Sequence, residues 1–142
     1  MPRRAALGAV LAVAVLILAG CATTIPSDAL KLSADSLARR QLQTRKFTGI
    51  TERDMLAASA GVLQDLSFVV DKADETLGTV SATKLSGYQL RMTVTVRPCG
   101  EKQLLVRASA EYKERAVEDP LPYQDFFAAL EKAMFLTAHQ VD

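Results

Sequence analysis

The sequence is poor in the residues on which most catalytic and metal sites depend. It contains one histidine, two cysteines and no tryptophan among 142 residues. One histidine and two cysteines are too few for the four ligands of a structural zinc site. No motif places a nucleophile and an orienting partner beside the histidine, as a catalytic histidine would need. Neither sign of charge is in excess, since 17 basic residues stand against 16 acidic ones. We therefore expect no enzyme, no cofactor, no metal and no generally basic nucleic-acid-binding surface.

The beginning of the chain has the layout of a secretory leader. A short basic segment, residues 1–4, precedes an apolar run from Ala5 to Leu18 that only Gly8 interrupts. This order is typical of a signal peptide. The run ends in small residues and a cysteine that match the lipobox of bacterial lipoproteins: Leu18, Ala19, Gly20 and Cys21.

The resemblance to bacterial lipoproteins implies that Cys21 carries a lipid anchor. In such proteins the thiol receives a diacylglycerol, the signal is cut before the cysteine, and the new amino group is acylated. Acyl chains contribute about 0.8 kcal/mol per buried CH₂, so two or three of them hold a small domain on a membrane. Ala22 follows the cysteine, and in this family a residue other than Asp implies the outer membrane, facing the periplasm. The alternative is an uncleaved spanning helix, since the apolar run can be stretched to about the minimum length.

Cleavage before Cys21 would leave a lipidated cysteine and tether over residues 21–40 and a single domain over residues 41–142. Loss of the leader removes two arginines, which leaves 15 basic residues against 16 acidic ones. We expect no more than a short helical turn near residues 34–39 of the tether. A basic cluster follows, which we interpret as a solvated face, with contact to anionic headgroups as the alternative: Arg39, Arg40, Arg45 and Lys46.

The rest of the chain alternates between strand and helix patterns. A strand is predicted over residues 43–49, and then a helix over residues 52–66 with Thr51 as its cap. A second strand begins at residues 68–70, residues 71–75 form a turn, and a third strand follows over residues 77–84. Apolar and polar residues then alternate over residues 89–97 and 104–113, with a hairpin turn between them. A last helix begins at Asp119 and Pro120.

Both helices need an apolar surface to cover, and the predicted sheet has one apolar face and one polar face. We therefore predict an α+β two-layer sandwich. It would have an antiparallel sheet of about four to five strands with two helices packed on one face, in a helix-grip-like arrangement.

Several stretches resemble a group of small proteobacterial outer-membrane lipoproteins. They cover nearly all of the mature chain: residues 39–47, 55–71, 77–84 and 123–140. The group has no assigned activity, so the resemblance implies placement and fold more than function. The order of elements is also similar to that of the helix-grip domains of BamC, a lipoprotein subunit of the outer-membrane β-barrel assembly machine. That second similarity is one of topology and implies no functional residues.

Two features are candidates for contact with other molecules. Cys99, in the hairpin turn beside basic residues, could form an intermolecular disulfide, although an incidental turn residue is the commoner case. The polar face of the sheet has an arginine content that suits an acidic partner. Phe135 lies at the border of the apolar stripe of the last helix and would add a contact if exposed. The candidate surface comprises Arg91, Arg97, Arg107, Glu111 and Phe135.

These observations favour a non-enzymatic lipoprotein on the periplasmic face of the outer membrane. Its domain would be an accessory or scaffold subunit of an envelope protein complex, with a protein partner and with the membrane bound through Cys21. The alternative is a carrier that holds an apolar ligand or lipid between helices and sheet. That ligand would lie near small and β-branched residues of the central strands: Val94, Val96, Ala108 and Ala110.

Overall fold

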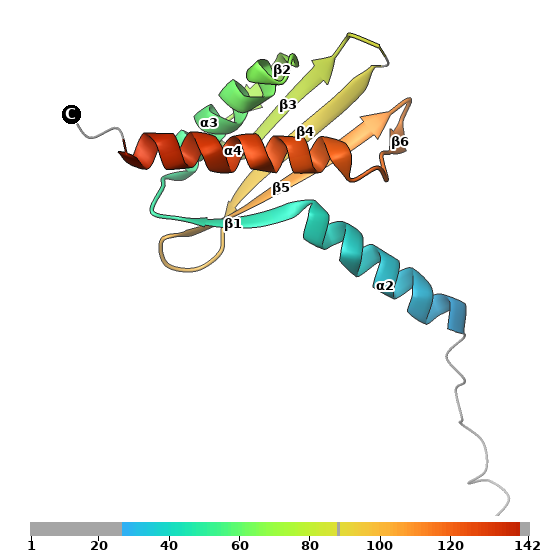
Figure 1. Cartoon of the computed structure of the whole chain (residues 1–142). Coiled ribbons are helices and arrows are strands. Elements are labelled where there is room, and N and C mark those ends of the chain that lie inside the picture. Colours follow the sequence, from blue (N-terminus) through green and yellow to red (C-terminus); the bar gives the residue numbers. More distant parts are fainter. Residues whose placement is uncertain (1–26, 88, 140–142) are drawn as a thin grey trace, which may run out of the picture. The chain divides into compact units, whose positions relative to one another are not determined.

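The computed structural model describes residues 27–87 and 89–139 (Figure 1). The predicted signal peptide, the lipobox and Cys21 lie outside the described residues. Within the described ranges, no helix is long and apolar enough to span a bilayer. The elements follow in the order α2 (Ser27–Leu42), β1 (Thr44–Thr48), α3 (Glu52–Asp65), β2 (Val69–Asp74), β3 (Thr79–Lys84), β4 (Leu90–Pro98), β5 (Gln103–Tyr112), β6 (Arg115–Ala116) and α4 (Leu121–His139).

The strands form one antiparallel sheet in the order β1-β5-β4-β3-β2. The two-residue strand β6 also pairs with β5, beyond the end of β1. The central pair, β4 and β5, is in register from Leu90 opposite Tyr112 to Pro98 opposite Leu104. Helices α3 and α4 pack on one face of this sheet (Figure 1). The fold is therefore the predicted two-layer α+β sandwich, with β6 added to the expected strands.

The alternation of β4 and β5 builds the core as predicted. The side chains at every second position are buried, and those between them face the other side of the sheet. The two helices contribute the largest buried side chains, including Met55, Tyr123, Phe126 and Phe127. At about 25 cal/mol per Å² of apolar surface removed from water, such side chains dominate the stability of a domain this small.

Local capping explains where the two packed helices begin. The Thr51 hydroxyl oxygen accepts the backbone N–H of Asp54 at 3.2 Å, which confirms the predicted cap of α3. Helix α4 begins at Leu121, slightly later than predicted, and the Asp119 carboxylate accepts the Leu121 N–H at 3.0 Å. Tyr123 then ties α4 to the sheet edge, because its hydroxyl donates to the Val117 carbonyl at 2.7 Å.

The predicted turn over residues 71–75 is wrong. β2 continues through these positions to Asp74, with a bulge between Val70 and Lys72. The Thr83 hydroxyl donates to the Asp71 carboxylate at 2.6 Å across the strand pair. Cross-strand partners on β3 therefore outweigh the turn preference of the polar sequence, and the turn lies after Asp74.

The expected short helical turn near residues 34–39 is also wrong, because α2 runs for 16 residues. Its sequence includes four Leu, three Ala and two Arg, which have high helix propensity, so the helix extends well beyond one turn. The compact unit that holds the sheet comprises Asp35–Asp142, so the last residues of α2 belong to it.

Candidate functional site

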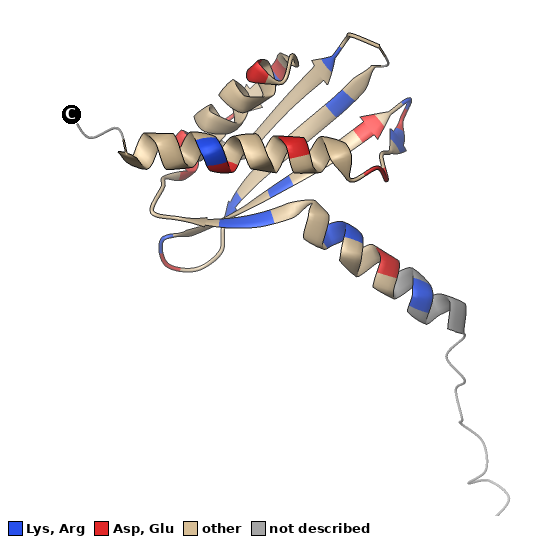
Figure 2. Cartoon of the chain, in the orientation of Figure 1, with Lys and Arg blue, Asp and Glu red and all other residues tan. Residues whose placement is uncertain are grey.

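The face of the sheet opposite α3 and α4, here called the outer face, collects the predicted charged residues. Arg91, Arg97, Arg107 and Glu111 are exposed side chains at outward positions of β4 and β5. Lys46 joins them from β1, where it lies opposite Leu105. Figure 2 marks the positions of basic residues in blue on all three strands.

The register decides how these charges are balanced. Glu111 lies directly opposite Arg91, so this cross-strand pair is close to neutral. Arg107 lies opposite Thr95 and Thr44, which carry no charge. Arg97 donates to the Leu77 carbonyl and, at 3.3 Å, to the Val96 carbonyl. The outward positions of β1, β5 and β4 thus hold four basic side chains and one acidic side chain, in a setting of threonine and serine.

Phe135 does not belong to the outer face. It lies near the end of α4, is 61% exposed, and stacks on His139 with ring centroids 4.1 Å apart. Leu121, at the other end of α4, is 57% exposed. The structure therefore leaves both apolar side chains in solvent but places them on the helical layer, apart from the arginines.

Cys99 lies in the turn between β4 and β5, as predicted. Its N–H donates to the Gln103 carbonyl at 2.9 Å, and its side chain is partly exposed. Arg97, one of the expected basic neighbours, is held by backbone carbonyls instead. The intermolecular disulfide stays a prediction. Among the residues that the structure describes, no group of three or more His, Cys, Asp or Glu side chains could hold a metal ion.

The positions expected for a ligand between helices and sheet are filled with protein. Val94, Val96, Ala108 and Ala110 are at most 1% exposed and belong to the core. Ala108 and Ala110 bring the helical layer close to the sheet instead of leaving a cavity. A carrier site at these four residues is therefore not available in this conformation.

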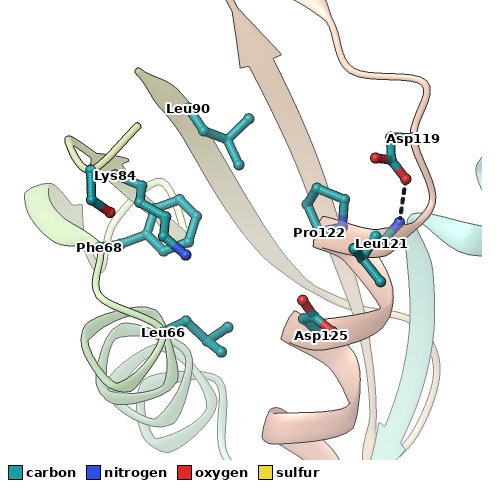
Figure 3. A pocket seen from close by; sticks show the side chains of 9 residues that line it. Leu66, Phe68, Lys84, Leu90, Asp119, Leu121, Pro122 and Asp125 are labelled. Carbon is teal, nitrogen blue, oxygen red and sulfur yellow. Dashed lines mark hydrogen bonds between the residues drawn. The ribbon is translucent and has the colours of Figure 1, made fainter. Parts of the chain in front are cut away.

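A cleft of about 290 Å³ opens at another place, where the end of α3, the end of β3 and the start of β4 meet the start of α4. Figure 3 shows Phe68 and Lys84 on one side and Leu121 and Pro122 on the other. We call it the α3–α4 cleft. Its lining is mostly apolar, with three charged side chains: Leu66, Phe68, Lys84, Ser86, Leu90, Asp119, Leu121, Pro122 and Asp125.

Sequence reasoning missed Lys84, and an available signal could have found it. Val80 and Ala82 are buried, and Lys84 continues their alternation, opposite the buried Leu90. Lys84 therefore lies on the inner face of the sheet, at a position where the pattern calls for an apolar side chain. Its ammonium lies 5.6 Å from the centroid of the Phe68 ring.

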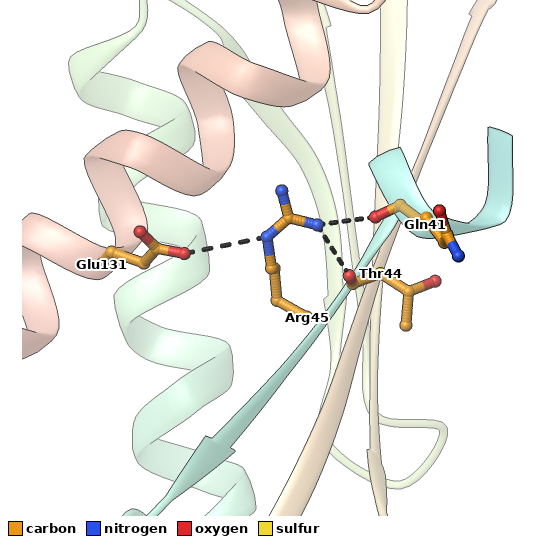
Figure 4. Close-up of polar contacts among 4 residues, drawn as sticks. All are labelled: Gln41, Thr44, Arg45 and Glu131. Atoms are coloured by element: carbon orange, nitrogen blue, oxygen red, sulfur yellow. Dashed lines mark hydrogen bonds and ion pairs between the residues drawn. The ribbon is translucent and has the colours of Figure 1, made fainter. Parts of the chain in front are cut away.

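Arg45 is another basic residue on the inner face, which corrects its interpretation as part of a solvated cluster. Its guanidinium donates to the carbonyls of Gln41, at 2.6 Å, and Thr44, at 3.0 Å (Figure 4). It also pairs with Glu131 of α4 at 3.8 Å and lies 5.1 Å from the centroid of the Phe127 ring. Arg45 thus joins the end of α2, β1 and α4.

Arg39 is also engaged within the domain. Its guanidinium pairs with the carboxylate of Glu118 at 3.2 Å. Arg39 and Arg45 therefore have partners in the fold, and Arg40 and Lys46 are the exposed members of the predicted basic cluster.

One carboxylate has a shifted pKa. The backbone N–H of Leu77 donates to Asp74 at 2.9 Å and lowers the pKa of that carboxyl, with a further contribution from the Lys72 ammonium. The effect stabilises the turn between β2 and β3. It lies away from the α3–α4 cleft and points to no acid–base chemistry.

No protein-family model matches the chain, and no curated protein matches it. Among solved structures, it is similar to a crystal structure, at 1.49 Å resolution, of a DUF4468 family protein from Bacteroides ovatus. The two are 13% identical over 66% of this chain and 80% of that chain, with a TM-score of 0.30. A likeness at this level says nothing of function.

Proposed function

We propose that the protein is a non-enzymatic lipoprotein, anchored in the outer membrane through Cys21, whose domain is an accessory or scaffold subunit of a periplasmic protein complex. The leader sequence supports the anchoring and the location. The outer face of the sheet supports the role as a subunit, because its exposed basic side chains suit an acidic protein surface.

The observation that carries the proposal is the contrast between the two faces of the sheet. The inner face is covered by two helices, and its central residues are completely buried. The outer face carries Arg91, Arg97 and Arg107 without a matching number of acids on the same strands. Complementary charge across an interface speeds association and selects partners more than it adds affinity. An adaptor that must choose one acidic partner among many envelope proteins needs such a surface.

The carrier hypothesis loses the position first expected for its ligand, since the residues there are core residues. A carrier function would depend on the α3–α4 cleft instead. That cleft lies on the helical side of the sheet and is independent of the outer face.

The partner can be identified by crosslinking in intact cells, followed by mass spectrometry of the proteins that co-purify with the lipidated chain. We expect a stoichiometric envelope protein with the wild type and its loss with the double variant Arg91→Glu, Arg107→Glu. The matched control is Lys132→Glu, Arg40→Glu, which changes the net charge equally at exposed positions off the sheet. Recovery of the protein alone, or equal loss with the control, would contradict the proposed surface.

The anchor has a separate test. Growth with a palmitate analogue that can be labelled should mark the wild-type protein and not the Cys21→Ser variant. The variant should also leave the membrane fraction. An unmarked wild-type protein that retains its leader would favour the spanning helix.

A further inference from the structure

Arg45 and Lys84, both on the inner face, differ in the interactions that their charged groups make within the fold. Arg45 has two carbonyl oxygens, a carboxylate and an aromatic ring around its guanidinium. Lys84 has the Phe68 ring, and the structure records no ion pair for it within the described ranges. The Lys84 side chain is partly exposed and lies beside apolar residues of the cleft, where an anion that water does not screen fully would stabilise its ammonium. The α3–α4 cleft therefore contains an inward-facing cation for which the described residues provide no ion pair.

The acids around the cleft do not provide that counter-ion. The Asp119 carboxylate already accepts the Leu121 N–H, at the positive end of α4. Asp125 is an exposed side chain on the first turns of α4, so water weakens its interactions. Neither acid is within ion-pair distance of Lys84 in the structure.

The size of the cleft limits its occupant. A water molecule takes a share of about 30 Å³ in the liquid, so a volume of about 290 Å³ corresponds to roughly ten waters. Binding pockets for small molecules begin at about this size. Leu66, Phe68, Leu90 and Leu121 offer apolar contact, which suits one hydrocarbon chain of medium length and not a lipid with two long chains.

We propose that the α3–α4 cleft binds a single hydrocarbon chain that ends in a carboxylate, with the chain against Leu66, Phe68 and Leu121 and the carboxylate on the Lys84 ammonium. This is a ligand site in its own right. It depends neither on the lipid anchor nor on the partner of the outer face, so it can be tested on the purified protein.

Three probes with the same ten-carbon chain separate charge from apolar contact: decanoate, decanol and decylamine. Each is titrated below its micelle-forming concentration, and the dissociation constant is measured by calorimetry and by NMR shifts. A charge-assisted hydrogen bond contributes about 1.5 kcal/mol, so we expect decanoate to bind about tenfold more tightly than decanol. Decylamine should bind most weakly, because Lys84 repels it.

Variants locate the effect. Lys84→Gln should reduce the preference for decanoate over decanol to about onefold, and the control Lys132→Gln should leave it unchanged. Leu121→Trp, at an exposed position on the edge of the cleft, should weaken binding of all three probes. Its fold can be checked separately by circular dichroism.

Three results would overturn the proposal. The first is tightest binding of decylamine, weakened by Asp125→Asn, since it would assign the cleft to cations. The second is a preference for decanoate that survives Lys84→Gln. The third is no saturable binding of any probe by the folded wild type.

Discussion

Replacement of Arg45 by alanine should destabilise the domain more than any other single change to its exposed or half-exposed charges. The side chain is 38% exposed, so each interaction is reduced by solvent. Each of its two hydrogen bonds to carbonyl oxygens would contribute about 1.5 kcal/mol, the low end of the range for charged donors. Solvent exposure reduces this value, so the two bonds together contribute about 1 kcal/mol. The stacking on Phe127 adds about 0.5 kcal/mol, and the ion pair with Glu131, at 3.8 Å, adds about 0.3 kcal/mol.

The expected loss for Arg45→Ala is about 2 kcal/mol of unfolding free energy. For a domain of this size it corresponds to a fall in Tm of roughly 8 °C. Denaturant titration followed by circular dichroism gives the free energy, and calorimetry gives Tm. Glu131→Gln removes only the ion pair and should cost less than about 0.5 kcal/mol. Arg45→Lys retains the charge without the planar fork and should fall between the two.

Arg40→Ala is the matched control, since Arg40 is an exposed arginine in the last turn of α2, five residues before Arg45. It should lie within about 0.5 kcal/mol of the wild type. If Arg45→Ala were equally neutral, the connection between α2, β1 and α4 would contribute nothing to stability. The cluster would then be a solvated face, as the sequence alone indicates.

Three further changes test other parts of the fold by denaturant titration. Tyr123→Phe leaves the Val117 carbonyl without its hydroxyl donor and should cost about 1–3 kcal/mol; no change would mean that the hydrogen bond is not formed. Gly78→Ala should cost about 2 kcal/mol or more, because φ is +59° and the new Cβ would lie 2.6 Å from the Val96 carbonyl oxygen; a neutral result would place the turn differently. Asp74 has a folded-state pKa below its ordinary 3.8, so its stabilisation is present above pH 3.8 and is lost as the pH falls through the folded value. Asp74→Asn should therefore be less stable than the wild type at neutral pH and converge with it in acid, whereas a constant difference would assign the effect to something other than ionisation.

The parts of the fold that the sequence predicts well are those in which one strong period governs a long segment. The alternation of β4 and β5 and the stripe of α3 each place several large side chains on one face. In the two strands, a shift of register by one residue would expose all of these side chains. The apolar stripe of the last helix has the same basis, and its Phe126 and Phe127 are buried.

The errors lie where the local sequence is polar and distant partners decide the structure. Asp71 and Asp74 are typical turn residues, yet β3 pairs with β2 on both sides of the bulge at Asp71 and extends the strand to Asp74. Lys72, between them, lies in a strand at the free edge of the sheet. Charge and a bulge on an edge strand discourage pairing with another chain. The polar residues that suggested a turn therefore protect an edge strand instead, and this role can be recognised only when the strand order is known.

Of the candidate sites, too, one follows from a local sequence pattern and the other depends on the arrangement of distant elements. The arginines of the outer face could be predicted, because alternation alone assigns them to the polar side. The α3–α4 cleft could not be predicted, since it requires the ends of α3 and α4 to be placed relative to β3. Lys84 is nevertheless visible in the sequence as a charged residue at an apolar position after Val80 and Ala82, and Arg45 breaks the pattern in the same way before Phe47.

A basic residue at an apolar position has either a structural role or a role in binding a ligand. The groups that contact the cation in the structure distinguish the two. Arg45 is surrounded by acceptors and fastens elements together, whereas Lys84 faces a cleft with one aromatic neighbour. Arg45, with its interactions complete within the fold, has a structural role, whereas Lys84, with no ion pair among the described residues and an apolar cleft beside it, is the residue on which the proposed ligand depends.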